Sequence, residues 1–118
     1  MSEEAIDLKE VLERVQDDKE LLAELFDIFQ QDYDVKRKLI QEVVEKNDFE
    51  QLKGLAHSLK GASGNISAKK LHVLFMEMEQ MAKAQDLSKA AGLLASLDQE
   101  YTKLIANIAK LKQDFKKP

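Results

Sequence analysis

The stretch LSKAAGLLASLDQEYTKLIANIAKLKQDF, residues 87–115, decides the fold. Its apolar side chains return every three or four positions, at Leu94, Leu97, Tyr101, Leu104, Ile105, Ile108, Leu111 and Phe115. This is the period of an α-helix with one buried face. At 1.5 Å of rise per residue the helix is roughly 40 Å long, enough to line a whole helical bundle. We therefore predict a long amphipathic helix over about residues 87–115.

The preceding residues show the same period, interrupted by short polar breaks. The pattern predicts helices over about residues 8–16, 18–32 and 34–46, a fourth that ends near Gly64, and a fifth between Ser67 and Asp86. Asp17 and Asp18 offer an N-cap at one break, and Asn47 and Asp48, which prefer caps and turns, form another. Long helices joined by short connections pack as antiparallel neighbours. We therefore predict an all-α fold, an up-down antiparallel four-helix bundle with an additional N-terminal helix or helices.

Two boundaries in this prediction depend on few residues. The break between the second and third helices rests on the polar run at residues 32–34. The third helix is then expected to turn four side chains inward, namely Val35, Leu39, Val43 and Val44. The turn after the fourth helix lies in residues 64–67, where Gly64 or Asn65 suits a left-handed position and Ser67 suits an N-cap.

Composition narrows the class of protein. The 118 residues fit one domain, which we assign to residues 1–118 with a helical core over about 18–112. The chain has no Cys, so disulfides and thiolate metal sites are excluded, and a cytoplasmic location is expected. We expect no targeting leader and no membrane span, because no apolar run approaches roughly 18 residues. A net charge of −4 with both signs interspersed argues against nucleic acid as a partner.

The segment GLAHSLKGASG, residues 54–64, contains the candidate site. On a helical wheel of about 100° per residue, two lysines and three glycines lie within about 60° of His57, namely Lys53, Lys60, Gly54, Gly61 and Gly64. The apolar residues lie on the opposite side, at Leu52, Leu55, Leu59 and Ala62. His57 is therefore expected to point away from the core, towards solvent or a partner.

The glycines around His57 need a reason, because each glycine inside a helix costs about 0.8 to 1 kcal/mol relative to alanine. Because glycine has no side chain, these positions leave space beside the imidazole, so that a phosphoryl group or another protein's active site can approach. Lys60 and Lys53 supply positive charge where a phosphoryl group would lie. A neutral imidazole also has the lone pair that attack on phosphorus requires. His57 is thus a candidate nucleophile for phosphoryl transfer.

Several motifs that would indicate other chemistry are missing from the sequence. It has no Walker-type phosphate loop, no dinucleotide fingerprint and no carboxylate cluster on the His57 face to hold Mg²⁺. We therefore expect no cofactor and no ATP-dependent kinase activity, with Mg²⁺ supplied by a partner. A single nucleophile without a paired acid and base also argues against an autonomous enzyme.

Other residues that could attract attention have simpler interpretations. His72 is expected to be a surface or boundary residue, since it has no glycines around it in the sequence. Met76, Met78 and Met81 are expected to fill the core rather than form a cofactor site. The pair at 69–70, both lysines, is expected to solvate the start of a helix.

The motif AHSLKG, residues 56–61, and the residues ASGNI that follow it at 62–66 resemble the histidine phosphotransfer (HPt) family of two-component phosphorelay proteins. The resemblance extends over about residues 18–111. It implies that His57 accepts a phosphoryl group, that Lys60 steadies the phosphoryl oxygens and that Gly61 gives clearance. The sequence departs from the family at Ser67, where a glycine is usual, and we expect the turn to be retained.

The resemblance also implies the partners. Members of the family take the phosphoryl group from an aspartate of a receiver domain, or from a sensor histidine kinase, and pass it to the aspartate of another receiver. The alternative is a non-catalytic helical adaptor that binds such a domain without phosphoryl transfer. We expect a monomer. The initial Met indicates a free-standing protein, with a domain of a larger kinase as the alternative.

Docking of a receiver needs apolar anchors beside His57. The second predicted helix carries two apolar stripes, one of Leu21, Leu25 and Ile28 and one of Leu22, Phe26, Phe29 and Tyr33. We expect members of the second stripe, Leu22 and Phe26 first and also Phe29, to be partly exposed and to dock a partner together with Lys53 and Gly64. The alternative is that all three apolar residues lie in the core.

Overall fold

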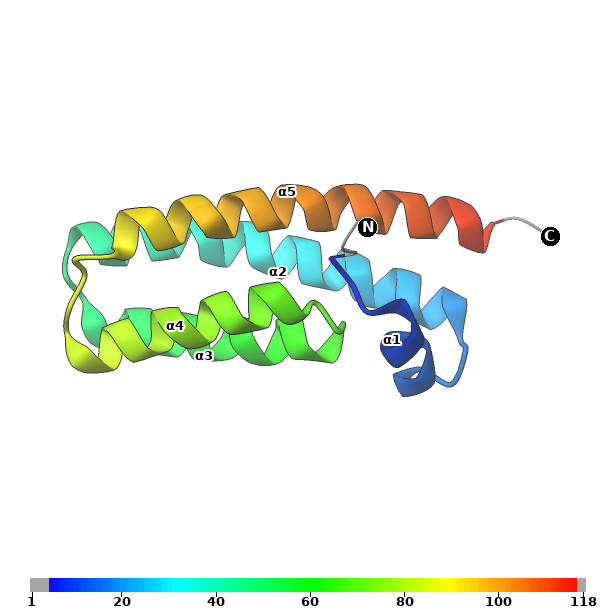
Figure 1. Cartoon of the computed structure of the whole chain (residues 1–118), viewed down its shortest axis with the longest axis horizontal. Coiled ribbons are helices and arrows are strands. Elements are labelled where there is room, and N and C mark those ends of the chain that lie inside the picture. Colours follow the sequence, from blue (N-terminus) through cyan, green and yellow to red (C-terminus); the bar gives the residue numbers. More distant parts are fainter. Residues whose placement is uncertain (1–4, 117–118) are drawn as a thin grey trace.

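The computed structural model of the chain describes residues 5–116, and within these residues it contains five helices and no strand. The helices are α1 (Leu8–Arg14), α2 (Lys19–Glu45), α3 (Phe49–Asn65), α4 (Lys69–Ala84) and α5 (Ala90–Phe115). Figure 1 shows α2 to α5 lying along the longest axis of the molecule, with α1 at one end. The predicted all-α class is confirmed.

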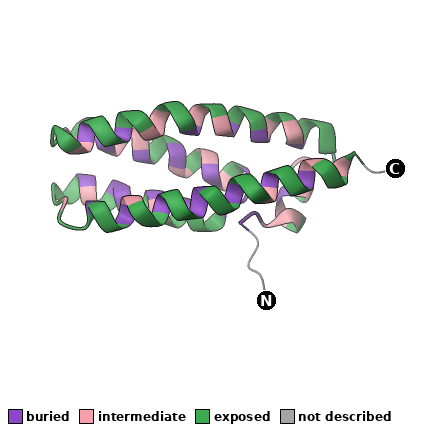
Figure 2. Cartoon of the chain, turned by 90° about the horizontal axis from the view of Figure 1, so that it is seen from above, coloured by how far each residue is buried: buried purple, intermediate pink, exposed green. Residues whose placement is uncertain are grey.

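The four long helices surround one core. Helix α2 contacts α3, α3 contacts α4, α4 contacts α5, and α5 returns to contact α2. Each helix turns its apolar side inward, and Figure 2 shows the buried residues as stripes on the facing sides. The largest fully buried side chains include Tyr33, Phe26, Phe75, Leu22, Leu59, Leu71, Leu97 and Leu104. Because the inner faces of the helices form the core, a functional site must lie on their outer faces.

Helix α2 is continuous through residues 32–34, so the predicted break there is wrong. Each of the three polar residues has a tertiary or helical partner that offsets its poor helix propensity. Asp32 forms an i,i+4 ion pair with Lys36, at 3.0 Å between Oδ1 and Nζ. The ring of Tyr33 stacks on Tyr101 of α5 with 3.6 Å between centroids, and the Tyr101 hydroxyl donates to Asp34. The two contacts with Tyr101 hold this part of α2 against α5.

The continuity of α2 changes which side chains of its second half are inside. In one continuous helix, Ile40 and Val43 continue the buried stripe that begins with Leu22. Val35 and Leu39 face outward, 62% and 39% exposed, so their predicted inward orientation is wrong. The α2 helix therefore presents an apolar face to the outside as well as to the core.

Helices α1, α2 and α3 begin with side-chain N-caps, whereas α4 and α5 do not. The side chains of Asp7, Asp18 and Asp48 each accept a hydrogen bond from the backbone N–H three residues later. Before α4, however, Ala68 occupies the N-cap position and Ser67 adopts the left-handed conformation, with φ of 57°. The predicted N-cap at Ser67 is therefore wrong. The turn needs a left-handed residue there, and the Ser67 hydroxyl donates to Glu10 of α1 at 2.8 Å.

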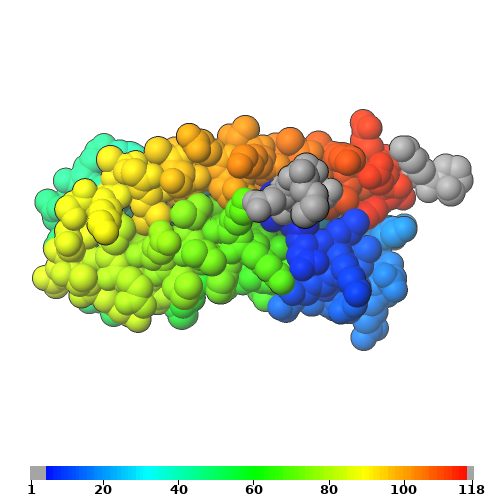
Figure 3. All heavy atoms as spheres, viewed as in Figure 1, coloured from blue at the N-terminus to red at the C-terminus, as the bar shows by residue number. Residues whose placement is uncertain are grey.

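Smaller differences lie in the remaining elements. Helix α5 begins at Ala90, because residues 87–89 form a turn after Asp86. Of the methionines expected in the core, Met78 is buried but Met76 is 40% exposed. Figure 3 shows α1 (blue) packed against the end of the bundle beside the start of α2. None of the helices within residues 5–116 is long and apolar enough to cross a membrane.

Candidate phosphotransfer site

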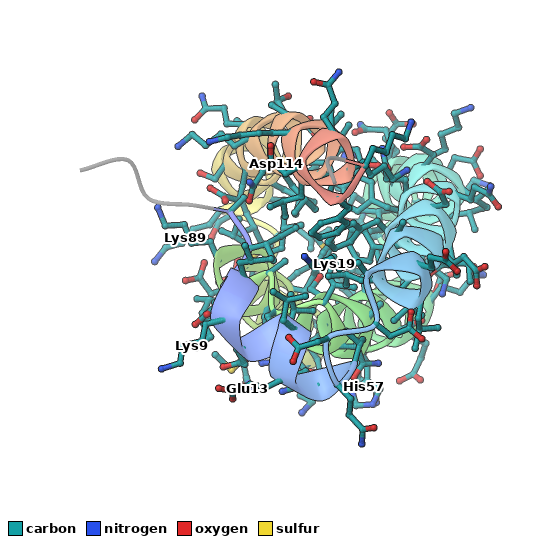
Figure 4. All side chains as sticks on the ribbon, turned by 90° about the vertical axis from the view of Figure 1, so that its right-hand side faces the viewer. Lys9, Glu13, Lys19, His57, Lys89 and Asp114 are labelled. Atoms are coloured by element: carbon teal, nitrogen blue, oxygen red, sulfur yellow. The ribbon has the colours of Figure 1, made fainter. Side chains whose placement is uncertain are left out.

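His57 lies on the outer face of α3, as the helical wheel predicted. Its side chain is 69% exposed, whereas Leu52, Ala56 and Leu59 of the same helix are buried. Figure 4, which looks along the bundle, shows His57 on the outside of the ring of helices. The imidazole is therefore accessible to another molecule.

The imidazole is held by a carboxylate of the neighbouring helix α4. His57 Nδ1 lies 2.9 Å from Glu79 Oε2, and Lys60 Nζ lies 2.6 Å from Glu79 Oε1. An ionised carboxylate only accepts hydrogen bonds, so Nδ1 carries the proton and donates it. This tautomer leaves Nε2 as the ring nitrogen with a free lone pair. One carboxylate thus fixes both the orientation of the imidazole and the position of the lysine.

The environment of Glu79 explains why it stays ionised although its side chain is only 7% exposed. The hydrogen bond from Lys60 lowers the pKa of the Glu79 carboxyl below its ordinary value of 4.5, and the bond from His57 adds to this effect. Desolvation raises the pKa of Glu79, but its effect is smaller than that of the Lys60 hydrogen bond. Glu79 is therefore an anion fixed beside the exposed imidazole.

His72 supports the same cluster from α4. Its Nδ1 lies 2.9 Å from the backbone oxygen of Lys60, to which it donates. A Cβ on Gly64 would lie 3.3 Å from His72 Nδ1, a tight contact that His72 could relieve only by shifting a few tenths of an ångström. His72 is a boundary residue, as predicted, but it packs against a glycine. Gly64 thus has a structural reason of its own, which is the close approach of α3 and α4.

The other glycines of α3 face open space. A Cβ added at Gly61 or Gly54 would meet no heavy atom within 4 Å. Packing within the molecule therefore does not require glycine at either position. On this side of His57, Ser58 Oγ accepts a hydrogen bond of 2.6 Å from Lys36 of α2. The uncovered surface beside the imidazole thus extends from α3 to α2.

The predicted docking residues are placed in two different settings. Lys53 lies on α3 at the edge of the site, partly exposed, with Nζ 4.0 Å from Glu50. In contrast, Leu22, Phe26 and Phe29 are buried in the core. Their predicted exposure beside His57 is wrong. The reason is that α1 covers the start of α2, while α3 and α5 pack on the rest of that stripe.

Two residues beside His57, Glu79 and Lys36, were not predicted from the sequence. Glu79 lies among the inward residues of α4, between Phe75 and Ala82 in the helical period, and an acidic residue on an apolar face is the signal that could have found it. Lys36 gave no such signal, because it is one of three consecutive cations, KRK, at residues 36–38.

Comparison with known proteins now adds to this geometry. The family model of the Hpt domain matches residues 21–107 of the chain. The chain belongs to the Hpt domain family. Its role is therefore histidine phosphotransfer in a phosphorelay, and His57 is the exposed histidine of this Hpt domain.

A solved structure shares the fold of this Hpt domain. The crystal structure of histidine-containing phosphotransfer protein B (HptB) from Pseudomonas aeruginosa PAO1 is similar over 95% of this chain and 98% of that chain, with a TM-score of 0.83 and 24% sequence identity. A comparison with curated protein sequences gives no match. The family match therefore supports the role, and the HptB structure supports the fold.

Proposed function

We propose that this Hpt domain, an up-down antiparallel four-helix bundle with one added N-terminal helix, is a phosphocarrier that receives and returns a phosphoryl group at Nε2 of His57. The observation that carries the proposal is the exposed imidazole whose Nδ1 is bound to the buried carboxylate of Glu79. The donor is the phosphorylated aspartate of a receiver domain, or a sensor histidine kinase, and the acceptor is the aspartate of another receiver.

The transfer step exchanges one bond to phosphorus for another and needs only His57, Glu79 and the receiver's phosphorylated aspartate. The Nε2 lone pair attacks phosphorus, an N–P bond forms, and the P–O bond to the receiver's aspartate breaks to restore its carboxylate. The ring gains positive charge as the bond forms. The Nδ1 proton stays between the ring and Glu79, whose negative charge offsets this gain. Reversal of the same step passes the group to the next aspartate.

Lys60 and Gly61 are proposed to act on the phosphoryl group in different ways. Lys60 Nζ is bound to Glu79 before transfer, and its flexible side chain can turn towards the phosphoryl oxygens one helical turn away. Gly61 adds no side chain beside the imidazole, so the receiver's active site can come close. Lys53 and Gly64 are proposed to lie under the edges of the docked receiver.

Most of the catalysis is proposed to reside in the partner. Phosphoryl transfer depends chiefly on positioning and charge stabilisation. The partner's receiver domain would supply Mg²⁺ and the aspartate, and this chain would supply an oriented nucleophile. We propose a cytoplasmic location on the basis of its Cys-free composition.

The test is transfer of radioactive phosphate from phosphorylated receiver domains. The expected result is a label on this protein that acid removes and base does not, as is typical of phosphohistidine. His57→Gln should abolish the label. His72→Gln is the matched control, because it changes the other histidine of the chain, and it should keep the label.

Binding without labelling would contradict the proposal. If several phosphorylated receivers bind wild type and His57→Gln equally well and neither protein becomes labelled, the domain is a helical adaptor. If the label persists in His57→Gln, the phosphoryl acceptor is another residue.

A further inference from the structure

The outer face of α2 carries a row of mostly apolar residues that do not pack in the core. Six positions alternate at spacings of four and three residues, the spacing of the inner positions of a coiled coil, namely Leu21, Leu25, Ile28, Asp32, Val35 and Leu39. We call these six positions the outer α2 seam. Ile28 and Val35 at its middle are 61% and 62% exposed, and Leu21 and Leu39 at its ends are 40% and 39% exposed.

No helix of the described residues packs over the exposed positions of the outer α2 seam, and only Leu25 and Asp32 within it are partly covered. Figure 4 shows the outer side of α2 (blue to cyan) with no helix packed against it. Single exposed apolar residues are ordinary on protein surfaces, but a contiguous row along one helix marks an interaction surface. The row is about 27 Å long, since 18 residue steps separate its ends and each rises 1.5 Å.

We propose that the occupant of the outer α2 seam is a second copy of this chain, bound with its α2 helix antiparallel. In the register that matches the seam to itself, Leu21 lies against Leu39 of the second copy and Leu25 lies against its Val35. Every contact then occurs twice, as a two-fold dimer requires.

The charges beside the seam support the antiparallel register. Glu24, Gln31 and Lys38 flank it at intervals of seven residues on one side. In antiparallel coiled coils these flanks face each other, so Glu24 of each copy meets Lys38 of the other and the two Gln31 meet at the centre. Glu24 and Lys38 are exposed, and neither forms an ion pair with a residue in the described range 5–116.

The one polar position of the seam also selects the direction. In a parallel pair in register, the two Asp32 carboxylates would face each other across the contact, which is unfavourable. In the antiparallel pair each Asp32 faces Ile28 of the second copy and keeps its own ion pair with Lys36. A carboxylate in the seam still weakens the contact.

These features define a weak dimer rather than a permanent one. A contact one helix wide falls in the smallest class of specific interfaces, below about 1,200 Å² in total. We expect a dissociation constant on the order of 10 to 100 µM. The monomer predicted from the sequence is then the form present in dilute solution.

The dimer has a consequence for the site, which rests on the proposed phosphocarrier function. Lys36 lies beside the seam and binds Ser58, the neighbour of His57. A second copy on α2 would therefore lie on the open side of the imidazole, where a receiver must dock. Self-association and receiver docking are then mutually exclusive.

The first test is sedimentation velocity of the full chain from about 5 to 500 µM. Wild type should change from monomer to dimer, and Val35→Glu should weaken association at least about 10-fold. Val73→Glu is the matched control, since Val73 is an exposed valine of α4, and it should associate like wild type. Unchanged helical circular dichroism of both variants would show that they are folded.

Charge reversal tests the register. Glu24→Lys and Lys38→Glu should each weaken self-association about 3-fold, because each places like charges together. An equimolar mixture of the two variants should associate more strongly than either alone, since both cross-pairs are then opposite in charge.

Each alternative outcome overturns the proposal and is independent of phosphorylation. A chain that stays monomeric at 500 µM has no dimer. If Val35→Glu instead lowers receiver affinity in a chain that never dimerises, a receiver domain is the occupant of the seam. If the mixture associates no better than the single variants, the antiparallel register is wrong.

Discussion

The two sides of His57 are built differently. On the α4 side the imidazole contacts a polar cluster. In this cluster Glu79 binds both His57 and Lys60, and His72 donates a hydrogen bond to the backbone oxygen of Lys60. On the α2 side, Gly54 and Gly61 leave the surface open. In the proposed function, the closed side orients the nucleophile and fixes its proton, whereas the open side admits the partner.

The largest expected effect comes from filling the open side. Gly61→Phe places a large side chain one helical turn from the imidazole, and transfer from a phosphorylated receiver should fall about 100-fold, since small displacements of reacting groups cost this much. The measurement is the single-turnover rate of phosphoryl transfer.

Two controls separate blocked docking from lost reactivity. Gly92→Phe makes the same change in open space on α5 and should leave the transfer rate unchanged. Labelling of Gly61→Phe by a small phosphoramidate donor should persist. A Gly61→Phe variant that exchanges phosphate with receivers at the wild-type rate would show that the open side has no role in docking.

Disrupting the closed side should have a smaller effect. Glu79→Gln keeps the size of the side chain but removes the charge that offsets the positive ring, and we expect the transfer rate to fall about 10-fold, the low end of the effect of losing a carboxylate that orients a metal-bound imidazole. Receiver affinity should change little, because Glu79 is buried. Glu77→Gln, at an exposed position of the same helix, is the control and should transfer normally.

The glycines on the two sides should differ in their effect on stability. Gly61→Ala should raise the free energy of unfolding by about 0.8 to 1 kcal/mol, because alanine favours the helix and its Cβ meets no atom. Gly64→Ala should gain less or lose stability, because its Cβ would press on His72 at 3.3 Å. Urea unfolding measures both, and equal gains would contradict the packing described for His72.

The smallest expected effect is on stability in acid. The pKa of Glu79 is lower in the folded chain than its ordinary value of 4.5. The unfolded chain therefore takes up a proton first as the pH falls, so the stability that Glu79 contributes above about pH 4.5 is lost below it. Glu79→Gln should show a shallower loss of stability from pH 5 to pH 3 in urea titrations. An identical slope for variant and wild type would contradict the lowered pKa.

The sequence predicted those features that depend on local periodicity. The helical class, and the outward orientation of His57 opposite Leu52 and Leu59, follow directly from the 3.6-residue period. The continuity of α2 through residues 32–34 could not be predicted in this way. Tyr33 stacks on Tyr101, 68 positions later, and such tertiary contacts override helix propensity.

The closed side and the outer face of α2 show the same limit. Glu79 lies 22 positions from His57, and only the register of α3 against α4 brings them together. The two apolar stripes of α2 both have helical spacing, so the period alone could not tell that Phe26 is buried and Ile28 exposed. Which stripe faces the core is decided by the neighbouring helices.

The most direct test of the account is to identify the nitrogen that carries phosphorus. The domain would be phosphorylated by a receiver, and its histidines, labelled with ¹⁵N, observed by NMR together with ³¹P. We predict one N–P bond, at Nε2 of His57, with Nδ1 still protonated beside Glu79. Phosphorus on Nδ1, or on His72, would contradict it.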